Sequence, residues 1–569
     1  MLALLLLHAA VVAPAFDLDT VGQRSNYQRT GRVDEVAQAC ERLKQLHSDD
    51  AACDVIGTTP EGRPLHAFTI GRRKPGKPSL LVIGGIHAGE IDGKDASFLI
   101  IEELLNAKSV DDVSVVFVPV YNVDGHERFG KNHRPNQRGP EEMGWRTTSS
   151  NLNLNRDFTK ADSPETRALL GLIRKIDPVL ICDLHVTDGA QFQHDIAVIV
   201  EPIVDDGANG ALVPVAAALS SSLQAQLKKT GHLPLPFYPS FEVDDDPSSG
   251  FAIGVTPARY SHGYAARRGR LGVLVETHSW RTSRERVLAT ADLLRALLSL
   301  AKTQAAAWQK AANDVDAAGR ALPGKMVTLA WDTDADKKTT LDFLGYAYTR
   351  EPSAISGALW TRYDESQKQT WQVPWWGSVK AATTTTAPAS YAVMPGYAQP
   401  VAERLTAHGI AFSTLAAPQV VNAQSFRADA VTFGAKPYEG RTTAKPVGAW
   451  SQASSLTLPP GALVVPVAQP LGRLVVEMFE PGAPESFVGW GFFNAAFEQK
   501  EYMEPYVAEA EARAMLLKDP ALHKEFSAKL SSDPTFAKDP EARLDFFYRR
   551  HPAWDERKDL LPVLRLTSP

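Results

Sequence analysis

Cysteine, net charge and long apolar runs are all scarce in this chain of 569 residues. It has three cysteines, and their spacing does not resemble a zinc-binding cysteine cluster. A net charge of −6 and an isoelectric point near 6.2 give no electrostatic case for binding nucleic acid or an anionic membrane. The apolar run at the start, Met1 to Val12, is too short to span a bilayer. We therefore expect neither a nucleic-acid-binding protein nor a membrane-spanning one.

The first residues resemble an export signal. The apolar run is followed by Ala13-Pro14-Ala15, a small-residue cleavage site, although the usual positive residues before the run are missing. We predict a signal peptide over residues 1–15 and a periplasmic or extracellular location; the alternative is an apolar tail. Cys40 and Cys53 could form a disulfide that leaves Cys182 over, or all three could be buried thiols.

What the chain does have is the composition of a globular protein. It is 44% hydrophobic and 22% charged, and its length exceeds what one hydrophobic core usually supports. We therefore expect at least two domains.

One buried strand stands out because a histidine and a glutamate follow it. Leu80-Leu81-Val82-Ile83 is a short run of apolar residues, and Gly84-Gly85 then turns the chain. His87 and Glu90 come next, three residues apart, a spacing that lets an imidazole and a carboxylate hold one zinc ion. By itself this pair is a weak signal.

Two further apolar runs end in the same way. The run from Val179 ends at His185, and the run from Leu271 ends at Glu276. Strands that alternate with helices predict a largely parallel, mixed α/β sheet flanked by helices, in which functional groups gather at the carboxyl ends of the strands. The four polar residues are all at such ends, which predicts a single site.

Taken together with Asn155-Arg156, these residues resemble the zinc carboxypeptidase family, peptidase family M14. The family pattern is His-x-x-Glu, then Asn-Arg, then a lone His, then a Glu near the end of the catalytic domain, and the match covers about residues 50 to 290. The resemblance implies one Zn²⁺ ion held by His87, Glu90 and His185. It also implies that Glu276 is the general base for a zinc-activated water. The alternatives are a satisfied core histidine at position 185 and a Glu276 paired with Arg281.

The resemblance assigns further residues to the substrate. Asn155 and Arg156 would hold its terminal carboxylate, because a guanidinium group matches a carboxylate with two hydrogen bonds; the alternative is a helix-entry salt bridge. An arginine in the long polar loop 126–150 would polarise the scissile carbonyl. Arg134 is our choice, with Arg138 and Arg146 left open.

Two features of the family pattern are less well matched. The mobile tyrosine of the family would be Tyr260 or Tyr264, of which we prefer Tyr264; the alternative for either is a core aromatic. Many members have an aspartate two residues before Asn-Arg that hydrogen-bonds the first zinc histidine, whereas this chain has Asn153. An amide can still orient His87 but makes it less basic, unless a carboxylate such as Asp183 compensates.

The second half predicts α+β structure without a second catalytic constellation. Residues 326–376 are rich in Thr, Tyr and Trp and predict strands, and Trp360, Trp371, Trp375 and Trp376 are core residues or, alternatively, a sugar-binding face. The run Ala381 to Pro388 predicts a linker or loop tip. The aspartates at 205–206 and 244–246 would favour basic substrate side chains if they faced the substrate pocket; otherwise they are solvated.

We thus predict a signal peptide (1–15), a zinc carboxypeptidase-like catalytic domain (16–305) and an α+β accessory region (306–569). The predicted activity is hydrolysis of C-terminal peptide bonds. The alternatives are a zinc amidase or deacylase acting on acylated amino acids or cell-wall peptides, and a non-catalytic peptide- or glycan-binding protein on the same fold. A peptide is the expected partner, and the oligomeric state is left open.

Overall fold

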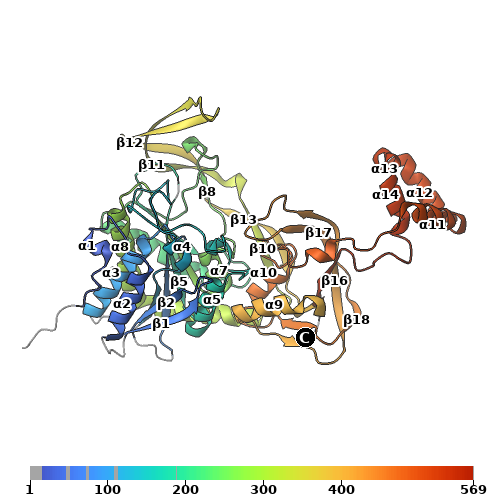
Figure 1. Ribbon diagram of the computed structural model, residues 1–569, viewed down its shortest axis with the longest axis horizontal. Helices are drawn as coiled ribbons and strands as arrows, with labels where there is room; N and C mark the ends of the chain where they lie inside the picture. Colours follow the sequence, from blue (N-terminus) through green and yellow to red (C-terminus); the bar gives the residue numbers. More distant parts are fainter. Residues whose placement is uncertain (1–15, 46–50, 72–75, 108–112, 188, 568–569) are drawn as a thin grey trace, which may run out of the picture.

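The computed structural model describes residues 16–45, 51–71, 76–107, 113–187 and 189–567 (Figure 1). The predicted signal peptide, 1–15, lies outside these ranges. Within them, no helix combines the length and apolar character that a membrane crossing requires.

A mixed eight-stranded sheet forms the centre of the N-terminal part. Its spatial order is β1 (Ala51–Thr58), β2 (Pro64–Ile70), β4 (Ser114–Val118), β3 (Ser79–Gly84), β5 (Leu180–Val186), β9 (Leu271–Thr277), β6 (Ile196–Glu201) and β7 (Pro234–Leu235). The central strands β4, β3, β5 and β9 are parallel, and antiparallel pairs flank them. Every residue of β3, β4, β5 and β9 is buried, which explains their predominantly apolar sequences. The predicted mixed, largely parallel sheet is confirmed.

Helices flank this sheet, as predicted. They are α1 (Val21–Arg24), α2 (Val33–Gln45), α3 (Asp92–Ala107), α4 (Val123–Glu127), α5 (Pro164–Ile176), α6 (Val213–Lys229), α7 (Ser261–Arg267) and α8 (Ser283–Arg320), with short 3₁₀ turns at Leu154–Arg156 and Pro247–Ser249. Ser163 caps α5, whose first residue is proline. Helix α8 packs on α3 and α6 and continues past residue 305, so the predicted domain boundary falls within a helix. The domain limits stay predictions.

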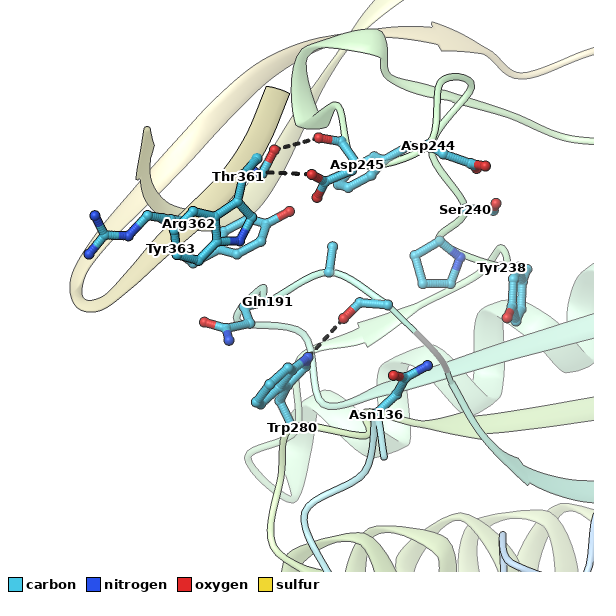
Figure 2. A pocket seen from close by; sticks show the side chains of 15 residues that line it. Asn136, Gln191, Tyr238, Ser240, Asp244, Asp245, Trp280, Thr361, Arg362 and Tyr363 are labelled. Atoms are coloured by element: carbon cyan, nitrogen blue, oxygen red, sulfur yellow. Dashed lines mark hydrogen bonds between the residues drawn. The ribbon is translucent and has the colours of Figure 1, made fainter. Parts of the chain in front are cut away.

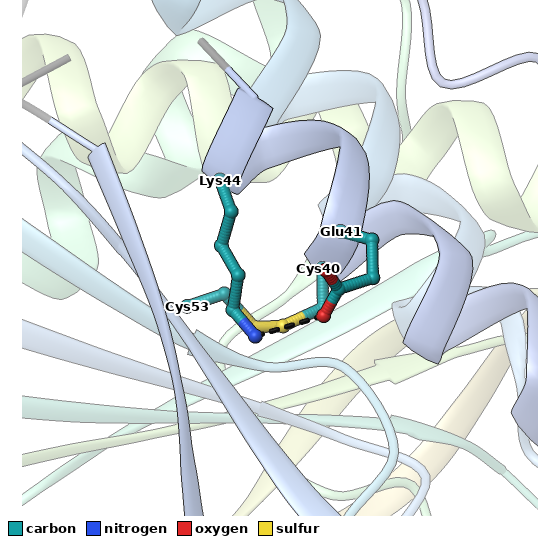
Figure 3. Close-up of a disulfide and its surroundings, with 4 residues drawn as sticks. All are labelled: Cys40, Glu41, Lys44 and Cys53. Carbon is teal, nitrogen blue, oxygen red and sulfur yellow. Dashed lines mark hydrogen bonds and ion pairs between the residues drawn. A yellow bond between two sulfur atoms is a disulfide. The ribbon is translucent and has the colours of Figure 1, made fainter. Parts of the chain in front are cut away.

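A disulfide ties α2 to the edge of the sheet. Cys40 on α2 and Cys53 on β1 are bonded, with their Cα atoms 5.5 Å apart, and the neighbouring Lys44 and Glu41 form an ion pair at 2.8 Å (Figure 3). Cys182 is a buried free thiol. The first of the two cysteine arrangements that the sequence allowed is therefore confirmed.

The C-terminal part is α+β, as predicted. Its strands are β10 (Met326–Thr333), β11 (Lys338–Pro352), β12 (Leu359–Trp376), β13 (Val379–Thr386), β14 (Ser390–Val393), β15 (Ser413–Thr414), β16 (Gln419–Phe433), β17 (Ala444–Trp450), β18 (Ser454–Leu458), β19 (Leu463–Pro466) and β20 (Leu560–Leu566). Its helices are α9 (Pro395–His408), α10 (Gly472–Phe479), α11 (Pro505–Lys518), α12 (Pro520–Ser532), α13 (Pro534–Lys538) and α14 (Pro540–Tyr548), with 3₁₀ turns at Ala335–Lys337 and Asn494–Phe497. Figure 1 shows α11 to α14 as a separate helical group at one end of the molecule and the β11–β12 hairpin projecting from another.

Two expectations for this half need correction. The threonine-rich segment near residue 381 is not a linker: it is strand β13, which pairs with β10 along its length. Threonine is β-branched, so it favours a strand when a partner is available. The prediction that the tryptophans are core residues is confirmed for Trp371, which is in a core cluster with Phe251 of the short strand β8 (Phe251–Ala252). It is wrong for Trp360, which is 53% exposed.

Polar contacts join the two parts. The carboxylate of Glu485 accepts hydrogen bonds from the Thr159 hydroxyl and the Trp490 indole, both at 3.1 Å, and pairs with Arg259 at 3.2 Å. Burial raises the pKa of Glu485 to about 7, although Arg259 opposes this. The interface therefore contains a carboxyl group that titrates near neutral pH.

Candidate metal centre and substrate site

A tight turn after β3 places His87 beside Glu90. Gly85 has a φ of +62°, and a side chain on Gly84 would lie 2.7 Å from the carbonyl oxygen of Pro119. The amide of Glu90 then donates to the carbonyl of His87 at 2.8 Å. The two glycines thus permit the turn that brings both side chains to the carboxyl edge of the sheet.

His185 reaches the same point from the neighbouring strand β5. One side-chain nitrogen or oxygen from each of His87, Glu90 and His185 lies within 4.8 Å of the other two, and all three residues are buried. The Nδ1 atoms of His87 and His185 each lie 2.9 Å from a different oxygen of the Glu90 carboxylate. The structure therefore brings together the three predicted metal ligands, although 95 residues separate Glu90 from His185.

The outer nitrogen of each imidazole is held by a side-chain oxygen. His87 Nε2 lies 3.1 Å from Asn153 Oδ1, and His185 Nε2 lies 2.8 Å from Asp183 Oδ2. Asp183 and His185 are two residues apart on β5, so their side chains share one face of the strand. Asp183 thus supports the second histidine rather than compensating for Asn153 at the first.

Charge in this group is unevenly distributed. Burial lowers the pKa of His87 to about 4, so this ring is neutral at pH 7. Burial also opposes protonation of His185, but Asp183 and Glu90 outweigh it and hold the pKa of His185 well above its ordinary value. Burial would raise the pKa of Glu90, but the neighbouring histidines and Arg134 lower it well below its usual range. The group is thus built around an ionised carboxylate.

This donor set fits a zinc ion. When each Nε2–H donates to its oxygen, the Nδ1 lone pairs of His87 and His185 point toward the carboxylate of Glu90. Lone pairs directed at one point repel each other unless a proton or a cation lies between them. Two imidazoles, each oriented by a side-chain oxygen at its Nε2, and one carboxylate match the ligand type and number of a catalytic zinc site.

Glu276 lies next to this group. It is directly opposite His185 in the parallel pairing of β5 with β9, and it is 7% exposed. Its charge is among those that raise the pKa of His185. The guanidinium of Arg281, the alternative partner for Glu276, donates to the carbonyl of Gln193 at 2.6 Å.

The long polar loop delivers arginines to the site. Arg134 is buried, and its Nη2 lies 2.8 Å from Glu90 Oε1; Arg146 approaches the same oxygen at 3.5 Å. Arg138 instead pairs with Glu365 and lies over the ring of Trp280. Two of the three arginine candidates are therefore at the metal ligands, and the third is turned away.

Asn155 and Arg156 follow Asn153 in a 3₁₀ turn beside the metal group. The Asn155 side-chain oxygen accepts from the Ser261 amide at 3.2 Å. Arg156 Nε donates to the hydroxyl of Tyr438 at 3.1 Å, and its guanidinium lies 4.2 Å from the centre of the Tyr260 ring. Among the described residues, the partners of Arg156 are this hydroxyl, this ring and the Asn155 carbonyl, and no carboxylate pairs with it, so the salt bridge considered as an alternative is not observed.

The preferred tyrosine, Tyr264, does not share this environment. It is fully buried, and its hydroxyl bonds His408 Nδ1 at 2.9 Å. The other candidate, Tyr260, is the one that contacts Arg156. Helix α7 begins at Ser261, so Tyr264 is turned into the protein while Tyr260 is the residue before the helix.

A cleft of about 720 Å³ lies between the segments that follow β5 and β9 and strand β12 (Figure 2). The segments after β5 and β9 contribute Gln191 and Trp280, and the loop before β8 contributes Tyr238 and Asp244. Strand β12 forms the opposite wall, where Thr361 binds Asp245 through its amide, at 3.0 Å, and its hydroxyl. One of the two acidic stretches therefore lines a pocket, whereas Asp206, in the other, is buried against Arg267 and Arg473.

Residues 36–195 match the family of zinc carboxypeptidases. Among characterised relatives, carboxypeptidase E of Caenorhabditis elegans is 30% identical over 152 residues, which are 24% of this chain and 29% of that protein. Carboxypeptidase B of Rattus norvegicus is 25% identical over 119 residues, which are 20% of this chain and 29% of that protein. The chain thus spans less than a third of the length of these relatives.

The chain is also similar to one inactive relative and to a solved metallo-carboxypeptidase structure. An inactive metallocarboxypeptidase of Saccharomyces cerevisiae, ECM14, is 28% identical over 130 residues, or 20% of this chain and 30% of that protein. A metallo-carboxypeptidase structure from Burkholderia cenocepacia aligns with a TM-score of 0.36 at 17% identity, covering 47% of this chain and 69% of that one. The matched segment contains His87, Glu90, Asn155, Arg156 and His185, so the predicted resemblance to the zinc carboxypeptidase family is confirmed for residues 36–195.

Proposed function

We propose that this protein is a zinc-dependent metallocarboxypeptidase that hydrolyses C-terminal peptide bonds. The observation that carries the proposal is the convergence of His87, Glu90 and His185, with both Nδ1 atoms facing one carboxylate, beside Glu276. The resemblance to zinc carboxypeptidases alone does not carry it, because one of the similar proteins is an inactive metallocarboxypeptidase.

Each residue then has a physical task. Zinc held by the three ligands would acidify a bound water and polarise the substrate carbonyl. Glu276 takes the proton from the attacking water and returns it to the leaving nitrogen, a transfer that one carboxylate can perform in both directions. Arg134 places a buried positive charge where the carbonyl oxygen becomes negative.

The terminal carboxylate of the substrate binds Arg156 and Asn155. The Tyr260 ring and the Tyr438 hydroxyl orient the Arg156 guanidinium, which limits the conformational entropy lost on binding. In this assignment Tyr260 takes the role that we predicted for Tyr264 from the sequence. The upstream part of the peptide lies in the cleft walled by Trp280 and β12.

An oxidising location accords with the disulfide. Cys40–Cys53 is a bond that persists in exported proteins and is rare in the cytosol. We therefore propose that the protein acts in the periplasm or outside the cell.

Peptide hydrolysis by wild type and Glu276→Gln tests the activity. We expect release of single C-terminal residues from peptides with a free carboxylate, and a loss of about 10²-fold or more in the variant with zinc still bound. Glu509→Gln, which changes an exposed glutamate on α11, is the matched control. Full activity in Glu276→Gln would refute the mechanism.

The choice of substrate separates the rival activities. Turnover of acylated amino acids in preference to peptides would favour an amidase. Zinc binding without hydrolysis of either substrate would favour a non-catalytic binding protein.

A further inference from the structure

A β-hairpin of the C-terminal part reaches the candidate active site. Strands β16 and β17 are joined by residues 434–443, and Tyr438 and Arg441 pair across the tip, with mutual amide–carbonyl hydrogen bonds at 2.8 and 3.0 Å. Glu439 and Gly440 form the tight turn between them. This tip contacts the segment 152–156, nearly 300 residues earlier in the chain.

Two contacts connect the tip to functional residues. Glu439 Oε2 accepts from the backbone amide of Asn153 at 2.9 Å, and the Asn153 side chain in turn holds His87. The Tyr438 hydroxyl accepts from Arg156 Nε at 3.1 Å. One side chain of the tip therefore supports the metal-ligand side of the site, and the other supports the carboxylate-binding arginine.

The tip is itself firmly held. The Tyr438 ring stacks on Trp490, with ring centres 5.9 Å apart and planes at 11°. Arg441 donates from Nε and Nη2 to the carboxylate of Asp162, both at 2.6 Å, and lies over the ring of Phe492. Since Asp162 belongs to the N-terminal part, this ion pair holds the tip against that part of the protein.

Glutamate is an unfavourable residue type for the turn position that Glu439 occupies. Glu439 has a φ of +49° and Gly440 a φ of +76°, so both central residues are in the left-handed region. Such two-residue turns strongly favour Asn, Asp or Gly at the first position, because a longer side chain is strained there. A glutamate that persists in a strained backbone indicates a task for its side chain.

We propose that the hairpin tip completes the active site, with Glu439 and Tyr438 as positioning residues. Glu439 fixes Asn153, and through it the orientation of His87 toward the metal. Tyr438 fixes the guanidinium of Arg156 for the terminal carboxylate of the substrate. This inference rests on the proposed carboxypeptidase function and gives the C-terminal part a direct role in it.

Zinc affinity and melting temperature, measured for wild type, Glu439→Asn and Glu439→Gln, test the proposed role of Glu439. We expect Glu439→Asn to weaken zinc binding about three- to tenfold, less than the loss of a direct partner of a metal ligand. The same substitution raises the melting temperature, because asparagine suits the left-handed turn. Glu439→Gln keeps an oxygen acceptor for Asn153 and is expected to retain the zinc affinity of wild type. A purely structural role for Glu439 would not separate stability from zinc affinity in this way.

Steady-state kinetics on a peptide with a free C-terminus test Tyr438. Tyr438→Phe keeps the stacking on Trp490 and removes only the hydroxyl, so we expect KM to rise about three- to tenfold with kcat and zinc affinity nearly unchanged. Tyr506→Phe, at a 77% exposed tyrosine on α11, is the control.

Three results would overturn the inference while the proposed function stood: wild-type zinc affinity in Glu439→Asn, wild-type KM in Tyr438→Phe, or increased activity in either. Increased activity would mean that the tip obstructs the site. Failure of the wild-type protein to bind zinc or cleave the peptide would overturn the proposed function, and the inference with it.

Discussion

The support of His185 by Asp183 leads to a quantitative prediction about metal binding. Asp183 is fully buried, its Oδ2 lies 2.8 Å from His185 Nε2, and it also accepts from the Ser261 hydroxyl. Asp183→Asn keeps the size of the side chain and removes its charge. The loss of such a partner typically costs 10–100-fold in metal affinity, or about 1.4 to 2.7 kcal/mol.

The first histidine offers the opposite substitution. His87 is held by the neutral Asn153, and Asn153→Asp would convert that contact into a charge-assisted hydrogen bond. A gain of about 1 kcal/mol corresponds to roughly fivefold tighter zinc binding. The two substitutions at equivalent places in the site should therefore move zinc affinity in opposite directions.

Competition with a zinc-chelating dye measures both variants against wild type. Circular dichroism before and after removal of zinc verifies that each variant is folded. Unchanged affinity in Asp183→Asn would contradict the reasoning, and so would weakened affinity in a folded Asn153→Asp.

Three further predictions concern the scaffold and the cleft. Replacing Cys40 and Cys53 by alanine should reduce the free energy of unfolding by about 3 kcal/mol, as expected for a short closed loop, and urea titration under oxidising conditions measures it; an equally stable variant would contradict the role of the disulfide. Because the folded-state pKa of Glu485 is raised to about 7, its contribution to the free energy of unfolding is fully present below about pH 4.5 and is lost as the pH rises through 7, by up to roughly 3 kcal/mol. Glu485→Gln should therefore flatten the dependence of the free energy of unfolding on pH, and a wild-type slope in the variant would refute this. Trp280→Ala should raise KM for peptides long enough to enter the cleft and leave the shortest substrates unaffected; equal effects on both would place the cleft outside the substrate path.

The central strands and the metal-ligand group were readable from the sequence because their signals are local. Strands β3, β5 and β9 are buried on both faces, so each is predominantly apolar, and their parallel order places His87, His185 and Glu276 at one edge. The spacing of His87 and Glu90 follows from a glycine turn that the sequence also displays.

Contacts that depend on distant packing left no such signal. Tyr264 lies within α7 and Tyr260 immediately precedes it, so the choice between them depends on the residue at which α7 begins. Helix ends are uncertain by one or two residues even when a structure is known. Strand β13 forms because β10 lies alongside it, which a threonine-rich run cannot reveal by itself. The contact between Asn153 and Glu439 joins positions 286 residues apart, and nothing near either residue indicates the other.

Diffraction from zinc-soaked crystals, collected on both sides of the zinc absorption edge, tests the metal centre most directly. We expect one anomalous peak bounded by His87 Nδ1, His185 Nδ1 and the carboxylate of Glu90, and its disappearance in His185→Ala. A fully soaked crystal with no peak between these three side chains, or with its zinc bound elsewhere, would contradict the proposed hydrolase.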